Sequence, residues 1–242
     1  MARMARHPVP TPLRLADADT AADLRTYLGR ARRADPDGVA RLVGHGDVLA
    51  VYVSPVHGGG GPVVLGLRTL PLRAPATLDV TVPLAALDTP APPDGTVPPE
   101  APVLLDGAGP GEVLLEVPAG RAGPGAGPGV AWAGTSPPRR GWQGVAAVAP
   151  EVLRQVAAAG IAEVATGAPA GSGAAAVAAL RARVWGRDLS ADLPGLPAGV
   201  AFAAVGLGFV SAAPAAVYRN GPWWRVTTPA GHLLARRPLL GG

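Results

Sequence analysis

Basic and aromatic side chains gather near the C-terminus, and these residue types can hold phosphate groups or flat rings. Residues 218–225 read Tyr-Arg-Asn-Gly-Pro-Trp-Trp-Arg, and an Arg-Arg pair follows at 236–237. Arginine side chains contact phosphates, and aromatic rings stack on bases or on the side chains of a partner. We therefore predict a contact surface for nucleic acid or a protein partner, made of Arg219, Trp223, Trp224, Arg225, Arg236 and Arg237.

The same strip has a purely structural interpretation, in which a tryptophan closes the core and the arginines stay in solvent. The sequence leaves open whether Trp223 and Trp224 are core or surface residues. Three predicted helices ahead of a basic hairpin give the outline of a winged helix, in which arginines on the wing contact phosphates. However, the third helix, predicted at 199–210, has no side chain that can hydrogen-bond a base edge. The strip thus favours phosphate contact or stacking over sequence recognition.

Other residue types exclude several kinds of chemistry. The chain has no cysteine, which rules out disulfides, thiolate nucleophiles, iron–sulfur clusters and cysteine-bound zinc. The four histidines are scattered and form no HExxH motif, so only His45 with Asp47 remains as a minor metal pair. No serine stands in a GxSxG motif, and the glycines at 167–173 lack the Lys-Ser/Thr of a phosphate loop. We predict no catalytic residues, no metal and no cofactor.

The net positive charge of the chain is weak evidence for an anionic ligand, because the amino-acid composition reflects the base composition of the genome. All 21 basic residues are arginine, and the chain has 34 glycines and 29 prolines, as in a very GC-rich genome. The charge is uneven: residues 1–33 and 181–242 are net positive, and residues 34–150 are net negative. The basic ends could bind an anion or dock on the acidic middle.

We expect a cytoplasmic protein without a membrane span. The absence of cysteine is typical of a reducing compartment. The N-terminus is basic but lacks the apolar run of a signal peptide. The most apolar stretch, 199–217, is interrupted by Gly206, Gly208 and Pro214, which favours a buried helix.

The N-terminal half predicts a helix packed on an antiparallel sheet. Apolar residues at helical spacing indicate a helix at 19–34, with Asp19 or Thr20 as its N-cap. Apolar runs separated by glycines and prolines predict the strands of a meander. These runs lie at 39–43, 48–53, 63–70 and 77–82, and a further hairpin is predicted at 103–105 and 113–117.

A glycine- and proline-rich stretch at 120–141 divides the chain, since residues 121–129 are expected to hold no regular element. Beyond it we predict helices at 150–166, 173–185 (capped by Ser172) and 199–210, and strands at 216–219, 223–227 and 232–236. The predicted fold is α+β, with domains at 1–119 and 142–242 and a linker at 120–141. The first domain is a helix on an antiparallel sheet, and the second is a small helical domain closed by a C-terminal β-hairpin.

Short motifs in both halves are similar to those of one protein family. Residues 207–210 read Leu-Gly-Phe-Val, and 221–226 read Gly-Pro-Trp-Trp-Arg-Val, followed by Pro-Ala-Gly at 229–231. In the N-terminal half, an Asp-Pro turn at 35–36 precedes Val-Ala-Arg-Leu-Val at 39–43. This pattern resembles a family of uncharacterised two-domain proteins from high-GC actinobacteria. The resemblance implies a source and a two-domain plan, and no known activity or site residues come with it.

Together these features predict a non-enzymatic interaction or accessory protein that has a protein partner or self-associates. The prediction follows from the missing catalytic motifs and from the aromatic hairpin, which can serve as a docking surface. The alternative is a nucleic-acid-binding protein that uses Arg219, Arg225, Arg236 and Arg237. An enzyme whose carboxylates meet only in the folded chain is the third possibility.

Overall fold

The computed structural model describes residues 11–87, 104–106, 113–117, 121–122, 131–168, 171 and 173–237. Within these residues the strands are β1 (Thr11–Leu15), β2 (Val39–Val56), β3 (Val63–Pro83), β4 (Leu104–Asp106), β5 (Val113–Val117), β6 (Arg121–Ala122), β7 (Gln143–Val148), β8 (Ala215–Asn220), β9 (Trp223–Thr228) and β10 (Gly231–Arg236). The helices are α1 (Ala18–Ala34), α2 (Pro150–Gly167), α3 (Ala174–Gly186) and α4 (Gly199–Gly206), and the short 3-10 helices are η1 (Leu84–Leu87) and η2 (Ala131–Gly134).

The strands form one antiparallel sheet in the order β4-β5-β1-β3-β10-β9-β8-β7, and β2 and β6 also pair with β3. The long strand β3 holds the sheet together. It pairs with β2 along most of its length, and β10, β1 and β6 pair in turn with its first, middle and last residues. The pairing of β10 with β3, from Arg236 opposite Val63 to His232 opposite Leu67, joins the C-terminal strands to the N-terminal hairpin. The predicted α+β class is confirmed.

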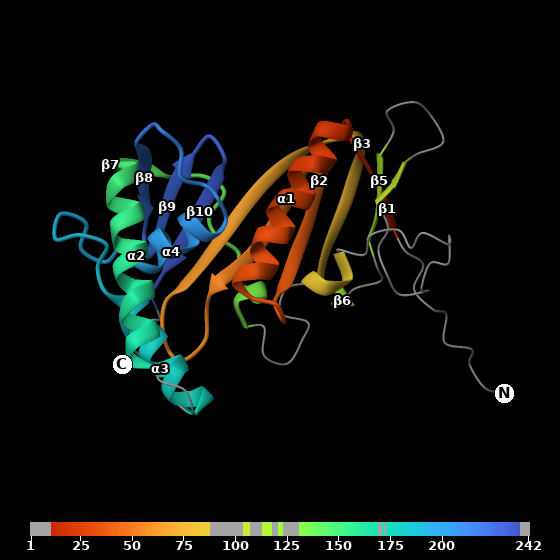
Figure 1. Ribbon diagram of the computed structural model, residues 1–242. Helices are drawn as coiled ribbons and strands as arrows, with labels where there is room; N and C mark the ends of the chain where they lie inside the picture. The colour runs from red at the N-terminus through yellow and green to blue at the C-terminus, as the bar shows by residue number, and fades with distance from the viewer. Residues whose placement is uncertain are drawn as a thin grey trace.

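Three of the helices, α1, α2 and α4, lie on one face of this sheet (Figure 1). α1 lies across the β2–β3 hairpin, and α2 and α4 lie in front of the C-terminal strands. Buried side chains from both groups form one continuous core, which includes Leu24 of α1, Leu153 of α2 and Val226 of β9. Burial of such apolar side chains is the main force that holds helices on a sheet. We call the opposite side of the sheet the outer face.

The first predicted helix is confirmed as α1, with its cap at a different residue. Asp17, rather than Asp19 or Thr20, is the N-cap, because its Oδ1 accepts a hydrogen bond of 2.7 Å from the backbone N–H of Thr20. Asp17 has an extended backbone directly ahead of the helix, which is the usual conformation of an N-cap residue. The predicted apolar face, which includes Leu24 and Leu28, is buried.

The predicted four-stranded meander is wrong, because its four runs form only two long strands. The first two runs are parts of β2, and the last two are parts of β3. The glycine-rich residues 44–47 do not end the strand, because the strand continues there with a register shift between Gly46 and Val48. Gly46 has a φ of 61°, so it supplies the local bend while the residues on both sides keep pairing with β3.

Most of the other predicted elements are confirmed. The hairpin at 103–105 and 113–117 is β4 and β5. α2, α3 and α4 cover the three predicted helices, although α4 ends at Gly206, and β8, β9 and β10 cover the C-terminal strands. β1 and β7 have no counterpart in the prediction. Ser172, the predicted cap of α3, lies outside the described residues.

Two features of the C-terminal half differ from the predicted outline. Arg121 and Ala122 form β6 and pair with β3, within the stretch predicted to hold no regular element. The three C-terminal strands lie inside the sheet, because β10 pairs with β3 and β8 pairs with β7. They are therefore part of the central framework, whereas the winged-helix outline predicts a hairpin at the rim of a helical domain.

The most apolar stretch of the chain, 199–217, is part of the core. It holds α4, in which Val200, Ala201, Ala203 and Ala204 are buried, and the first residues of β8. In the part of the chain that the structure describes, no helix is long and apolar enough to cross a membrane.

Candidate functional site

The two tryptophans of the predicted contact strip are both core residues, on opposite faces of the sheet. Trp224 is 7% exposed and belongs to the main core beneath the helices. Trp223 is 6% exposed and packs on the outer face with Leu65, Trp132 and Leu234. Successive side chains of a strand point to opposite faces, so each tryptophan closes a different side of the sheet. Neither ring is free to serve as a docking surface.

The arginines of the strip are divided between the same two faces. The guanidinium carbon of Arg219 lies 5.2 Å from the ring centre of Trp224, on the helix side. The guanidinium carbon of Arg236 lies 5.4 Å from the ring centre of Trp223, on the outer face. Arg237 forms an ion pair with a carboxylate of the loop between α3 and α4. The structure therefore does not bring the predicted residues together on one surface.

Arg225, the remaining arginine of the strip, lines a cavity of about 400 Å³ on the outer face. A cavity of this size can enclose a small ligand. We call it the Arg225 cavity and define it by Tyr52 of β2, Arg139 and Trp142 ahead of β7, Arg225 of β9, and His232 and Leu234 of β10. Both halves of the chain are needed to form its wall.

Aromatic rings enclose the charge of Arg225. Its guanidinium carbon lies 4.4 Å from the ring centre of Tyr218 and 4.8 Å from that of Trp142. These cation–π contacts hold the side chain without neutralising its charge. Its Nε is buried and has no hydrogen-bond partner, and no carboxylate of the described residues forms an ion pair with it. The cavity therefore holds a fixed positive charge that forms no ion pair with a described carboxylate.

Two titratable groups of the cavity wall, His232 and Tyr52, favour their neutral forms. Burial lowers the pKa of His232, and the positive charge of Arg225 lowers it further. Nδ1 of His232 is 3.0 Å from the hydroxyl oxygen of Thr227. Burial raises the pKa of Tyr52, against the smaller opposite effect of nearby arginines. One carboxylate, that of Asp47, lines the same wall as two arginines, so the wall is net positive.

Residues 131–142, which we call the outer segment, form one side of the cavity, and Arg41 anchors them. Arg41 is buried and donates to Asp79 from Nε and Nη2 at 2.8 and 2.6 Å, a bond that raises the pKa of Arg41. Its Nη1 donates to the hydroxyl oxygen of Ser136 at 3.3 Å. The indole N–H of Trp142 donates to the carbonyl oxygen of Pro138 at 2.9 Å. These bonds fix the ring that lies beside Arg225.

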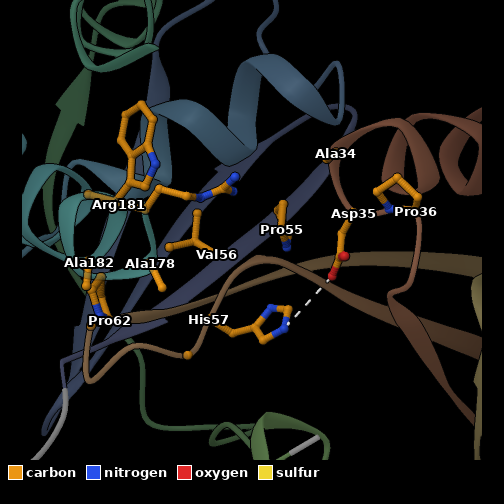
Figure 2. A pocket seen from close by; sticks show the side chains of 13 residues that line it. Ala34, Asp35, Pro36, Pro55, Val56, His57, Pro62, Ala178, Arg181 and Ala182 are labelled. Carbon is orange, nitrogen blue, oxygen red and sulfur yellow. Dashed lines mark ion pairs between the residues drawn. The ribbon is translucent and has the colours of Figure 1, made fainter. Parts of the chain in front are cut away.

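A second hollow, of about 300 Å³, lies between the end of α1, the β2–β3 turn and α3 (Figure 2). Oδ2 of Asp35 is 3.9 Å from Nε2 of His57, and Arg181 lines the hollow from α3. Nδ1 of His57 donates to the backbone carbonyl of Ser54 at 2.8 Å. We call this space the Asp35–His57 hollow. An acid, an imidazole and a guanidinium from three separate elements line this hollow.

The residues predicted from the sequence include Arg225 but not Tyr52, Trp142 or His232, which line the same cavity. Trp142 directly follows the predicted linker, and its sequence context gives no sign that it approaches Arg225. His45 and Asp47, the minor metal pair, both line the Arg225 cavity. Across the described ranges, no three His, Cys, Asp or Glu residues gather in a way that could hold a metal ion.

Two family models match the chain, one in each half. Residues 9–108 match a domain of unknown function (DUF8010), and residues 137–240 match a second domain of unknown function (DUF8185). No curated protein and no solved structure matches the chain. The two matches agree with the two-domain plan that the sequence resemblance implied. The first half of the chain is therefore similar to DUF8010 and the second half to DUF8185, which supports an uncharacterised two-domain family.

Proposed function

We propose that the protein is a non-enzymatic binding protein and that its Arg225 cavity takes a small aromatic acid. The observation that carries the proposal is the guanidinium of Arg225, which faces the cavity without a carboxylate partner among the described residues. A partly buried cation without a counter-charge is costly, and the carboxylate of a ligand removes that cost. Arginine binds carboxylates through two parallel hydrogen bonds, which also orient the ligand.

The rest of the wall suits a flat, apolar ligand body. Trp142 and Tyr52 offer aromatic surface, and Leu67 and Leu234 offer aliphatic surface. Ligand pockets commonly combine such an apolar wall with a few polar groups that set the orientation. His232 favours its neutral form, so it adds no second buried charge next to Arg225.

This proposal keeps the predicted non-enzymatic role but moves it away from the tryptophans of the hairpin. Trp223 and Trp224 are buried, so they support the sheet rather than a docking surface. Nucleic-acid binding has less support than ligand binding, because Arg219 lies on the helix side and Arg237 is already paired with Asp188. Phosphate contacts to one backbone need cations on a common surface.

Isothermal titration calorimetry with 1-naphthoate and the uncharged 1-naphthamide tests the proposal. We expect the acid to bind the wild-type protein, and the amide to bind about tenfold or more weakly, because the amide forms no charge-assisted bond to Arg225. The substitution Arg225→Gln should weaken binding of the acid by a similar factor, because it removes the charge that orients the carboxylate.

The matched control is Arg219→Gln. Arg219 also stacks on a tryptophan of the same sheet, but on the other face, so this variant should bind 1-naphthoate like the wild type. Near-ultraviolet circular dichroism confirms that both variants keep the wild-type packing of their aromatic residues. Wild-type protein that binds no aromatic acid, or an Arg225→Gln variant with unchanged affinity, contradicts the proposal.

One observation favours the predicted self-association as a second candidate function. Within the described residues β7 pairs only with β8, and its strand carries no charged side chain. A register shift places Val145 outside the β8 ladder, and Val145 is 50% exposed. A second copy can pair its own β7 with this edge in antiparallel register.

Sedimentation velocity over a range of protein concentrations tests this candidate. We expect a monomer–dimer equilibrium that shifts to monomer in Val145→Arg, because the substitution places a charge at the centre of the paired edge. Ile161→Arg is the control, since Ile161 is 47% exposed and lies on α2 rather than on β7. A wild-type protein that is monomeric at every concentration, or equal effects of the two substitutions, contradicts self-association through β7.

A further inference from the structure

The Asp35–His57 hollow carries opposite charges on different elements. Asp35 lies at the end of α1 beside His57 of the β2–β3 turn, and Arg181 extends from α3 (Figure 2). The lining also includes the apolar side chains of Pro55 and Val56. A ligand that fills this hollow therefore meets an anion at one end, a cation at the other and an aliphatic surface between them.

The hydrogen bond of His57 and its distance from Asp35 indicate which chemical group of a ligand could bind at the anionic end of the hollow. A backbone carbonyl only accepts hydrogen bonds, so the bond to Ser54 places a proton on Nδ1 of His57. In the neutral imidazole, Nε2 is then an acceptor. It lies 3.9 Å from Oδ2 of Asp35, which is also an acceptor. When His57 is neutral, these two acceptors form no hydrogen bond with each other, and a cationic N–H donor can bridge them.

Arg181 supplies the positive end of the hollow. Its guanidinium carbon lies 5.9 Å from the ring centre of Phe202, a contact that holds the side chain on α3. Phe202 in turn stacks on Trp185, with ring centres 4.7 Å apart. No carboxylate in the described part of the chain forms an ion pair with Arg181. Its charge is thus available to a carboxylate that enters the hollow.

We propose that the Asp35–His57 hollow binds a small aliphatic zwitterion. The ammonium group of the ligand donates hydrogen bonds to Asp35 and His57, and its carboxylate binds the guanidinium of Arg181. The aliphatic part of the ligand lies against the apolar lining. This ligand carries both charges and no ring, so the hollow and the Arg225 cavity bind different ligands at separate places.

Calorimetry with a series of amino acids of increasing length tests the proposal on the full-length wild-type protein. The series is glycine, β-alanine, 4-aminobutyrate and 5-aminopentanoate, and the comparison compounds are butylamine and butyrate. We expect one length to bind best, and both comparison compounds to bind about tenfold or more weakly, because each lacks one of the two charged contacts. If no member of the series binds, or if butylamine or butyrate binds as tightly as the best zwitterion, the proposal is overturned.

Two substitutions and one control test whether the zwitterion binds in the hollow. Arg181→Gln and Asp35→Asn should each weaken the best zwitterion by about tenfold or more, because each removes one charge from the hollow. Arg183→Gln is the matched control, because Arg183 is exposed on the same helix and does not line the hollow. Unchanged affinity in a folded Arg181→Gln variant overturns the proposal. If Asp35→Asn fails to fold, the proposal is tested by the affinities of the wild-type protein for the best zwitterion, for butylamine and for butyrate.

Discussion

Trp223 and Trp224 are neighbours in β9 and are both buried, one on each face of the sheet. The helices cover Trp224, whereas Trp223 is covered by a cluster that includes Trp132 of the outer segment. β9 is thus protected on both faces, although an antiparallel sheet commonly leaves one face in water. The outer segment therefore has a structural role as well as forming one wall of the Arg225 cavity.

Replacing either tryptophan with alanine should destabilise the protein by about 3–5 kcal/mol, because each substitution leaves a large cavity in a packed cluster. Urea unfolding followed by far-ultraviolet circular dichroism measures the free energy of unfolding. Ile161→Ala serves as the control, since this side chain is 47% exposed and should change that free energy by less than about 0.5 kcal/mol. If Trp223→Ala behaves like the control, Trp223 is not the core residue described above.

Two helix glycines should respond in opposite ways to alanine. A Cβ at Gly160 of α2 would overlap the indole ring of Trp185, whereas a Cβ at Gly29 of α1 meets nothing within 4 Å. Alanine has the higher helix propensity, so Gly29→Ala should stabilise the protein by about 0.5–1 kcal/mol. Gly160→Ala should instead destabilise it by about 1–3 kcal/mol, because the added methyl group forces α2 and α3 apart.

Thermal unfolding of both glycine variants checks this prediction, with Gly29→Ala as the internal control for helix propensity. The expected result is a higher Tm for Gly29→Ala and a lower Tm for Gly160→Ala. A rise in Tm for both variants would mean that α2 and α3 approach each other less closely than the contact of Gly160 with Trp185 indicates.

Loss of Arg41 should release the outer segment. Arg41 is 7% exposed and bonds both Asp79 and Ser136, so Arg41→Ala leaves these groups without their partner and should cost about 2–3 kcal/mol. Trypsin should then cleave faster after Arg139 and Arg140, which are exposed residues of this segment. Limited proteolysis followed by mass spectrometry measures the rate at those sites.

The matched control for Arg41 is Arg187→Ala. Arg187 also forms a two-bond pair, with Glu163, but both side chains are more than a third exposed, and such exposed pairs contribute little to stability. Cleavage after Arg139 and Arg140 should therefore stay at the wild-type rate in Arg187→Ala. Equal cleavage of Arg41→Ala and the wild type would show that other contacts hold the outer segment.

Patterns of neighbouring residues were sufficient to predict most helices and strands, because apolar spacing and turn residues within each segment determine those elements. The apolar spacing of Leu24 and Leu28 predicts α1, and the Asn-Gly turn at 220–221 predicts the β8–β9 hairpin. The continuity of β2 through residues 44–47 has a cause elsewhere in the chain: pairing with β3 on both sides of Gly46 compensates for the poor strand propensity of glycine. A local pattern does not contain that long-range partner.

The candidate sites were harder to predict than the elements, for the same reason. Arg225 was identified because tryptophans and arginines stand beside it in sequence, yet it faces Trp142, which reaches it only through the β7–β8 pairing. Asp35, His57 and Arg181 carry no motif, and their approach depends on how α3 packs near the β2–β3 turn. The basic ends and acidic middle of the sequence did not indicate which residues line either site.

The pKa of His232 should make the stability of the protein depend on pH. Burial first, and the charge of Arg225 second, lower this pKa from its ordinary value of 6.5. Between the lowered pKa and 6.5, the unfolded chain binds a proton that the folded protein does not, so the free energy of unfolding falls as the pH falls through this window. The loss amounts to about 1.4 kcal/mol for each pH unit between the two values.

Urea unfolding at pH 7.5 and at lower pH values, compared between the wild type and His232→Gln, isolates this contribution from that of the carboxylates. The wild type should lose more stability than the variant as the pH falls below 6.5. An NMR titration gives the pKa itself, and Arg225→Gln should move it upward while leaving it below 6.5, because burial is the larger cause. Identical pH dependence in the wild type and His232→Gln would show that His232 titrates as it does in water and that the wall of the Arg225 cavity is open to solvent.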